Sequence, residues 1–182
     1  GKVALSGAGD RLTGAANVAL SQVRSVDAPR GLAVDGSINA TLDDATLRIQ
    51  AQANDDVAVR ASVDLTLPVE ASAVPLRLAI VRTRDMSGQV EIHGQIQPIW
   101  DLFLGGERSL AGRVDINAAI AGTLAAPRIN GRMDVAEGAF RDNATGVSLN
   151  AMTLAGRFDD TTALIETFSA NDGAGGTVTG QG

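Results

Sequence analysis

Apolar and polar residues alternate along most of this chain with a period of two. Between residues 113 and 124 the even positions are apolar or small, and most of the odd positions are polar. Successive side chains of a β-strand point to opposite faces, so this pattern predicts a strand with one apolar and one polar face. Residues 88–97 and 128–136 follow the same rule, and the alternation continues through 34–65 and 147–158.

A short motif recurs inside these segments. GRVDI at 112–116 returns as GRMDV at 131–135, and GQVEI at 88–92 is an earlier copy. Each copy has glycine, a polar residue, an apolar residue, an acid and an apolar residue, which is again the alternation of a half-buried strand. We interpret the copies as one structural unit repeated and not as a catalytic motif.

Turn residues separate the predicted strands. The pairs Asp43-Asp44, Asp55-Asp56 and Asp159-Asp160 and the stretch 171–173 contain Asp and Asn, which favour tight turns. One segment breaks the alternation: residues 98–105 begin with proline, end with glycine and contain Trp100, the single tryptophan. This combination predicts one short helix that covers an edge or end of the sheet.

Many half-buried strands can form a sandwich, a closed sheet, a β-helix or a curled open sheet. Four glycines, at 94, 122, 131 and 156, fall on the apolar side of the alternation. Glycine weakens a strand unless the sheet bends or something approaches closely, so we expect sharp curvature around open space. The predicted fold is all-β: a long, curled, antiparallel-rich sheet, folded into a U-shaped trough with an apolar interior, and one short helix near 98–105. A family resemblance given below implies the same shape, known as a β-taco. We expect residues 1–182 to form a single trough segment of a longer repetitive protein.

Composition narrows the function. The net charge is −6, which argues against nucleic acid and against electrostatic docking on anionic lipid headgroups. Hydrophobic residues make up 45% of the chain but aromatic residues only 3%, so the apolar face consists of small aliphatic side chains. No run of 18 apolar residues occurs, so we expect no transmembrane helix in this segment.

Candidate chemistry is sparse. The chain has no cysteine, and its single histidine, His93, falls on the polar side of a strand. The aspartate pairs do not have the spacing of an EF-hand or of a calcium-binding repeat, and no GxSxG sequence marks a nucleophile. We therefore expect a non-enzymatic protein with no metal and no cofactor.

The segment GTLAAPRINGRMDVAEGAF, at 122–140, resembles the recurring signature of the TamB family (translocation and assembly module proteins), part of the AsmA-like, bridge-like lipid-transfer group. Further similarities are the helix near Trp100 followed by SLAGRVDI, the stretch MTLAGRF at 152–158, and the glycine-rich end after Phe168. The resemblance is most specific over 87–182. The first 86 residues share the alternation but no specific motif.

The resemblance implies the periplasmic part of an envelope protein that is anchored in the inner membrane of a diderm bacterium. Such a segment would bind phospholipid acyl chains, conduct phospholipids between the two membranes, and support outer-membrane biogenesis. A TamA-like outer-membrane partner would be met through regions outside this segment. The residues expected to line the lipid groove are Val90, Ile92, Ile96, Val114, Ile116, Ile120, Leu124, Ile129, Met133, Val135, Val147, Leu149, Leu154 and Phe158.

Two alternatives remain open at this stage. The same fold could act as a chaperone-like scaffold that holds outer-membrane protein strands by β-augmentation. An autotransporter-type β-helix, serving as an adhesin stalk, would instead predict short parallel coils. The hairpin-like aspartate turns argue against that form.

Overall fold

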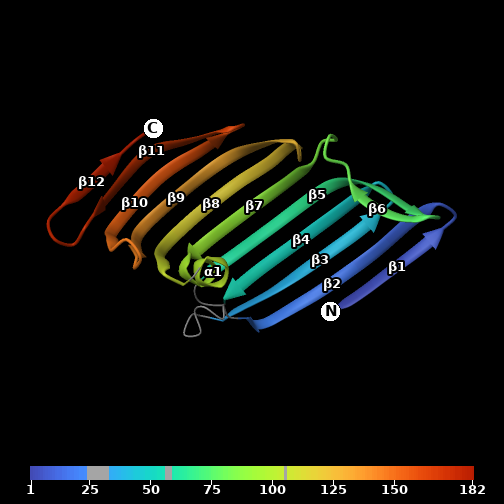
Figure 1. The fold of residues 1–182 in the computed structure, drawn as a ribbon, viewed down its shortest axis with the longest axis horizontal. Helices are drawn as coiled ribbons and strands as arrows, with labels where there is room; N and C mark the ends of the chain where they lie inside the picture. Colours follow the sequence, from blue (N-terminus) through green and yellow to red (C-terminus); the bar gives the residue numbers. More distant parts are fainter. Residues whose placement is uncertain (24–32, 56–58, 105) are drawn as a thin grey trace.

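The computed structural model describes residues 1–23, 33–55, 59–104 and 106–182. Within this part of the chain, twelve strands and one helix follow each other along the sequence (Figure 1). Their bounds are β1 Lys2–Ala8, β2 Arg11–Val23, β3 Val34–Asp43, β4 Thr46–Asp55, β5 Val59–Ala73, β6 Leu76–Ile80, β7 Ser87–Gln95, α1 Gln97–Phe103, β8 Arg108–Thr123, β9 Ala126–Asp142, β10 Val147–Asp159, β11 Thr162–Asn171 and β12 Thr177–Gly180.

The strands form one antiparallel sheet in the order β1-β2-β3-β4-β5-β7-β8-β9-β10-β11-β12, and β6 pairs with the far end of β5. Nearly every strand lies beside its sequence neighbour, so the sheet is a long meander with β1 and β12 at its two edges. The predicted all-β fold is confirmed. The antiparallel pairing excludes the β-helix alternative, which requires parallel coils.

The three copies of the repeated motif lie on the consecutive strands β7, β8 and β9. Val114 of GRVDI is opposite Val135 of GRMDV, and Ile116 is opposite both Met133 and Ile92 of GQVEI. Each copy therefore adds two apolar residues to one face of the sheet. The acids go to the other face, where Asp115 is opposite Asp134.

The predicted helix is confirmed as α1, which begins one residue before Pro98 and ends at Phe103. Gly105, the predicted stop, and Asp56 lie outside the described residues. The Asp43-Asp44 and Asp159-Asp160 pairs form hairpin turns, where Asp44 and Asp160 have positive φ angles of 52° and 54°. Among the described residues, no helix is long and apolar enough to cross a membrane.

The glycines of the apolar face have a different role from the expected one. A Cβ added to Gly131 would come within 2.5 Å of the Ala118 Cα, and one added to Gly36 within 2.7 Å of the Gln52 carbonyl oxygen. Gly94 and Gly122 have positive φ angles of 114° and 78°. These glycines therefore permit close strand approach and unusual backbone angles, and do not mark open space.

Candidate functional site

The candidate site is the face of the sheet that carries the alternating apolar residues, called the apolar face below. Cross-strand register aligns these residues in rows, and one row passes from Ala61 through Ile92, Ile116 and Met133 to Gly156. A second row passes from Val59 through Gly94 and Val114 to Val135 and Leu154. Because every pair is in register, the apolar residues of neighbouring strands form one continuous surface.

The middle of the apolar face is only partly covered. Ile92, Ile116, Ile120 and Met133 are half-buried, and Ile38 on β3 is 39% exposed. Residues on a sheet face that packs against a second layer would have nearly all of their surface removed from solvent. The described residues place no second layer on this part of the face.

One end of the apolar face is covered by a segment that we call the flap, residues 69–80, which comprises the last part of β5 and all of β6. The Val69 and Ala73 N–H groups donate to the Ala45 and Asp10 carbonyls, both at 2.8 Å, so the flap crosses the turns that join β1 to β2 and β3 to β4. Val69, the first residue of the flap, packs on Leu12 and Leu42 of the sheet beneath it, and these three residues form the core cluster.

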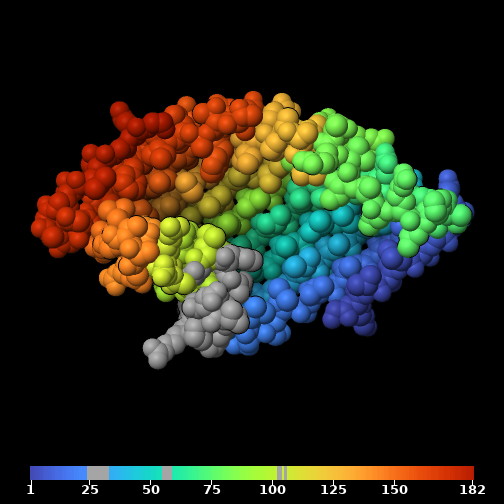
Figure 2. Space-filling view, viewed as in Figure 1, coloured from blue at the N-terminus to red at the C-terminus, as the bar shows by residue number. Residues whose placement is uncertain are grey.

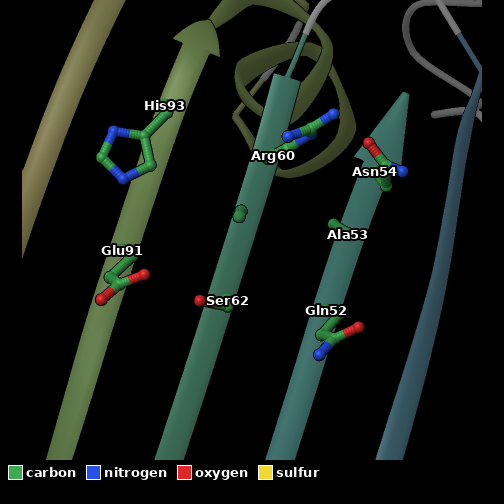
Figure 3. A pocket seen from close by; sticks show the side chains of 8 residues that line it. Gln52, Ala53, Asn54, Arg60, Ser62, Glu91 and His93 are labelled. Carbon is green, nitrogen blue, oxygen red and sulfur yellow. The ribbon is translucent and has the colours of Figure 1, made fainter. Parts of the chain in front are cut away.

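Helix α1 covers part of the opposite end. It lies in front of the strands in Figure 1, whereas in Figure 3, drawn from the polar side, it lies behind β5. Val59 and Val114, at this end, are only 2% and 4% exposed. The Trp100 Nε1–H donates to the Arg108 carbonyl at 3.2 Å and so ties α1 to the start of β8. Figure 2 shows the face hollowed between α1 and the flap.

Most of the residues expected to line a groove lie on strands of this face. Ile92, Ile116 and Met133 belong to the first row, and Val114, Val135 and Leu154 to the second. Parallel rows hold the others: Val90 leads through Ala118 and Gly131 to Phe158, and Ile120 is opposite Ile129. Ile96 instead caps the start of α1, and Leu124 lies in the β8–β9 turn, 37% exposed. Leu149 and Val147 lie beyond a bulge in β10, opposite Phe140 and Asp142.

The β2–β5 half of the apolar face was missing from the expected lining. Its half-buried residues pair directly with those of β7: Val63 is opposite Val90, and Leu65 is opposite Gly88. Ile49 and Ala51 of β4 extend the rows toward β3. The period-two alternation of residues 34–65 carried this signal. The resemblance to known motifs is most specific over 87–182, so it did not include these residues.

The polar face carries the single histidine. His93 Nδ1 lies 2.9 Å from Asp115 Oδ2, with both side chains about half-exposed or more. Next to this pair is a shallow depression of about 270 Å³, lined by Gln52, Asn54, Arg60, Ser62, Glu91 and His93 among others (Figure 3). No hydrogen bond joins Ser62 to His93 in the described part of the chain. The depression therefore lacks the nucleophile–base contact that acyl-transfer chemistry requires.

The pKa is lowered for three carboxyls, those of Asp64, Asp142 and Asp172, and the first two join neighbouring strands. The Arg48 guanidinium and the Gln50 amide hydrogen-bond Asp64 and lower the pKa of that carboxyl. Burial alone would raise the pKa of Asp142, but the Ala144 and Thr145 N–H groups and Arg108 together outweigh burial and lower it. Asp64 thereby links β4 to β5, and Asp142 links the β9–β10 turn to β8.

No family model matches the chain, and no curated protein or solved structure matches it either. What can be inferred about function therefore depends on the geometry of the sheet and on the sequence motifs.

Proposed function

We propose that this chain is a non-enzymatic, lipid-binding segment whose apolar face holds the acyl chains of phospholipids and conducts them along the sheet. The observation that supports it is the partly exposed apolar surface that runs in register across the sheet from β2 to β11. Each buried CH₂ group is worth about 0.8 kcal/mol, so an acyl chain leaves a bilayer only if another apolar surface replaces most of its environment. Strands about 4.8 Å apart provide such a surface without a break.

The composition of this face suits a mobile occupant. Its side chains are mainly Ala, Val, Ile and Leu, with few aromatic rings and few polar groups to fix one ligand position. Passage along such a surface needs no catalytic residue, cofactor or metal. Drug-sized ligand sites, in contrast, are enclosed and carry a few precisely placed polar groups.

The resemblance to the TamB family supports a location for this activity. We propose that the segment stands in the periplasm of a diderm bacterium, as part of an inner-membrane-anchored protein that supports outer-membrane biogenesis. A TamA-like outer-membrane partner would bind outside this segment. The continuous face from β2 to β11 suits a conduit that extends through many repeats.

Trp100 offers a direct test because it is the single tryptophan and belongs to the helix on the apolar face. Phospholipid with brominated acyl chains, added below its critical micelle concentration, should quench Trp100 fluorescence saturably. Ile116→Arg places a charge in the middle of the half-buried rows and should abolish saturable quenching. Ala119→Arg, on the polar face three residues along β8, is the matched control and should bind as the parent chain does.

Two results would reject the proposal. One is a parent protein that shows no saturable quenching, and the other is an Ile116→Arg variant, folded by circular dichroism, that binds lipid normally. Mass spectrometry of protein purified without detergent gives an independent check, because a lipid carrier should retain phospholipid near one-to-one or higher stoichiometry.

A second candidate function is favoured by the sheet edges. Every residue of β1 and β12 is exposed, and each strand has one paired neighbour among the described strands. An unpaired edge is a template for another strand, so the segment could hold unfolded outer-membrane proteins by β-augmentation. A single cysteine at Ser6→Cys should then cross-link to a denatured outer-membrane protein, whereas Ala119→Cys in mid-sheet should not. Equal labelling of both would reject strand capture.

A further inference from the structure

The flap exposes more apolar surface than any other short segment of the described chain. Val74, Leu76, Leu78 and Ile80 are 74%, 72%, 53% and 47% exposed. The last three lie on β6, which pairs with β5 and with no other strand of the described residues. Exposed aliphatic residues are ordinary when they are scattered, but four within seven positions on one hairpin form a patch that favours an apolar partner.

These side chains point in the direction of the apolar face. Ile80 is opposite Val69, Leu78 opposite Ala71, and Leu76 opposite Ala73. Val69 is 1% exposed and belongs to the core cluster with Leu12 and Leu42, so this side of the hairpin faces the sheet.

Edge strand β1 extends the patch. A Cβ on Gly7 would come within 2.8 Å of the Ala73 Cβ, so the Gly7 backbone lies close to the Ala73 methyl group. Val3 and Leu5 share the side of β1 that carries Gly7 and are 73% and 60% exposed. The aliphatic surface of the flap is therefore continuous with the rim of the apolar face.

The charge of the flap region is opposite to that of the rest of the chain. Residues 69–84, which are the flap and the four residues after it, contain Arg77, Arg82, Arg84 and one acid, Glu70, so they carry +2, while the remainder carries −8 because the whole chain carries −6. Arg77 and Arg84 line one depression on the outer side of the flap, beside Glu70 and Asp44. The net charge of the whole chain argues against binding to anionic headgroups, whereas the local charge of this segment favours it.

We propose that the flap docks on a bilayer surface that contains anionic phospholipid. The aliphatic residues of β6 enter the acyl region, and the three arginines bind headgroup phosphates, to which guanidinium groups are suited. Long arginine side chains can keep their charge at the headgroup level while their stems lie on apolar surface. A docked flap places the rim of the apolar face against the membrane, where a lipid can pass onto the sheet. This role builds on the proposed lipid binding.

Vesicle flotation tests the docking step. We expect the protein to float with phosphatidylcholine vesicles that contain about 30% phosphatidylglycerol, and to float less with phosphatidylcholine alone or in high salt, since anionic lipid attracts nearby basic residues and salt screens that attraction. Leu76→Asp with Leu78→Asp should lower vesicle partitioning about tenfold or more. Val178→Asp, at a 45% exposed residue on β12 and outside the surface from β2 to β11, is the control and should leave partitioning unchanged. Arg77→Gln with Arg84→Gln should remove the preference for anionic vesicles and the salt dependence.

Three outcomes would overturn the proposal: no flotation of the parent protein, equal flotation of the flap and control variants, or a dimer by light scattering that dissociates when Leu76 and Leu78 are replaced. The last would mean that the flap binds a second copy of the chain. Trp100 quenching separates this proposal from lipid binding itself. If the Leu76→Asp, Leu78→Asp variant does not float but still binds monomeric brominated lipid, it has lost docking alone. If Ile116→Arg floats but shows no quenching, it has kept docking and lost acyl-chain binding.

Discussion

Gly131 of β9 lies directly opposite Ala118 of β8, and a Cβ added to Gly131 would come within 2.8 Å of the Ala118 Cβ. The same Cβ would also press on the Asn117 carbonyl oxygen. Two of the three repeated motifs meet around this point, because Gly131 opens GRMDV and Ala118 is the second residue after GRVDI. The motif glycine on β9 therefore allows two strands to approach closely.

Gly131→Ala should destabilise the sheet for this reason. Forcing extra atoms into a close contact costs about 1–3 kcal/mol, and the neighbouring atoms on β8 include backbone that cannot rotate away. Urea unfolding should show a lower midpoint with an unchanged slope. Gly180→Ala on β12 is the matched control, since the nearest atom to its added Cβ is 3.9 Å away. Equal midpoints for the two variants would contradict the close approach.

Asp142 should make the protein sensitive to acid. Its pKa is lowered in the folded state despite burial, because Ala144, Thr145 and Arg108 donate hydrogen bonds to the carboxylate. A carboxyl whose folded pKa is depressed contributes stability above its unfolded pKa, which is about 3.9, and loses that contribution as pH falls through the folded value. Asp142→Asn should therefore lower the free energy of unfolding more at pH 7 than at pH 3.

The measurement is a series of urea titrations across this pH range. Asp10→Asn, in the exposed turn between β1 and β2, serves as the control and should follow the parent chain at each pH. A constant difference between Asp142→Asn and the parent from pH 7 to pH 3 would show that Asp142 acts through shape and not through charge.

The sequence predicted the two faces of the sheet well, because the period of two assigns each residue to a side without any knowledge of distant contacts. The sequence also indicates the bulge in β10. Its apolar residues are at odd positions at Val147 and Leu149 but at even positions from Met152 onward. Between them, Ala151 has a φ of 48°, and the pairing with β9 shifts register. Local alternation thus encodes the register shift.

The flap and the role of the glycines were not predictable in the same way. Residues 59–73 alternate as one strand, and nothing local shows that β5 leaves the main sheet after Pro68 and crosses the β1–β2 and β3–β4 turns. That path depends on contacts between Val69 and Leu12, which are 57 positions apart. The tight packing at Gly131 likewise depends on the distance between two strands and not on either sequence alone.

Replacing an apolar residue by alanine should lower the free energy of unfolding more in the covered part of the apolar face than in the open part. Leu42 is 5% exposed and packs beneath the flap with Leu12 and Val69, so Leu42→Ala should cost about 2–5 kcal/mol, as in a filled core. Ile116 has the same number of carbon atoms but is half-buried, so Ile116→Ala should cost clearly less. Urea unfolding of both variants measures the difference. When lipid is added, the difference in free energy of unfolding between the parent and Ile116→Ala should increase. Lipid stabilises the native state to which it binds, and the variant has lost part of the binding surface. Similar costs for both truncations in lipid-free protein would mean that the middle of the face is filled, and the open surface on which lipid binding depends would be lost.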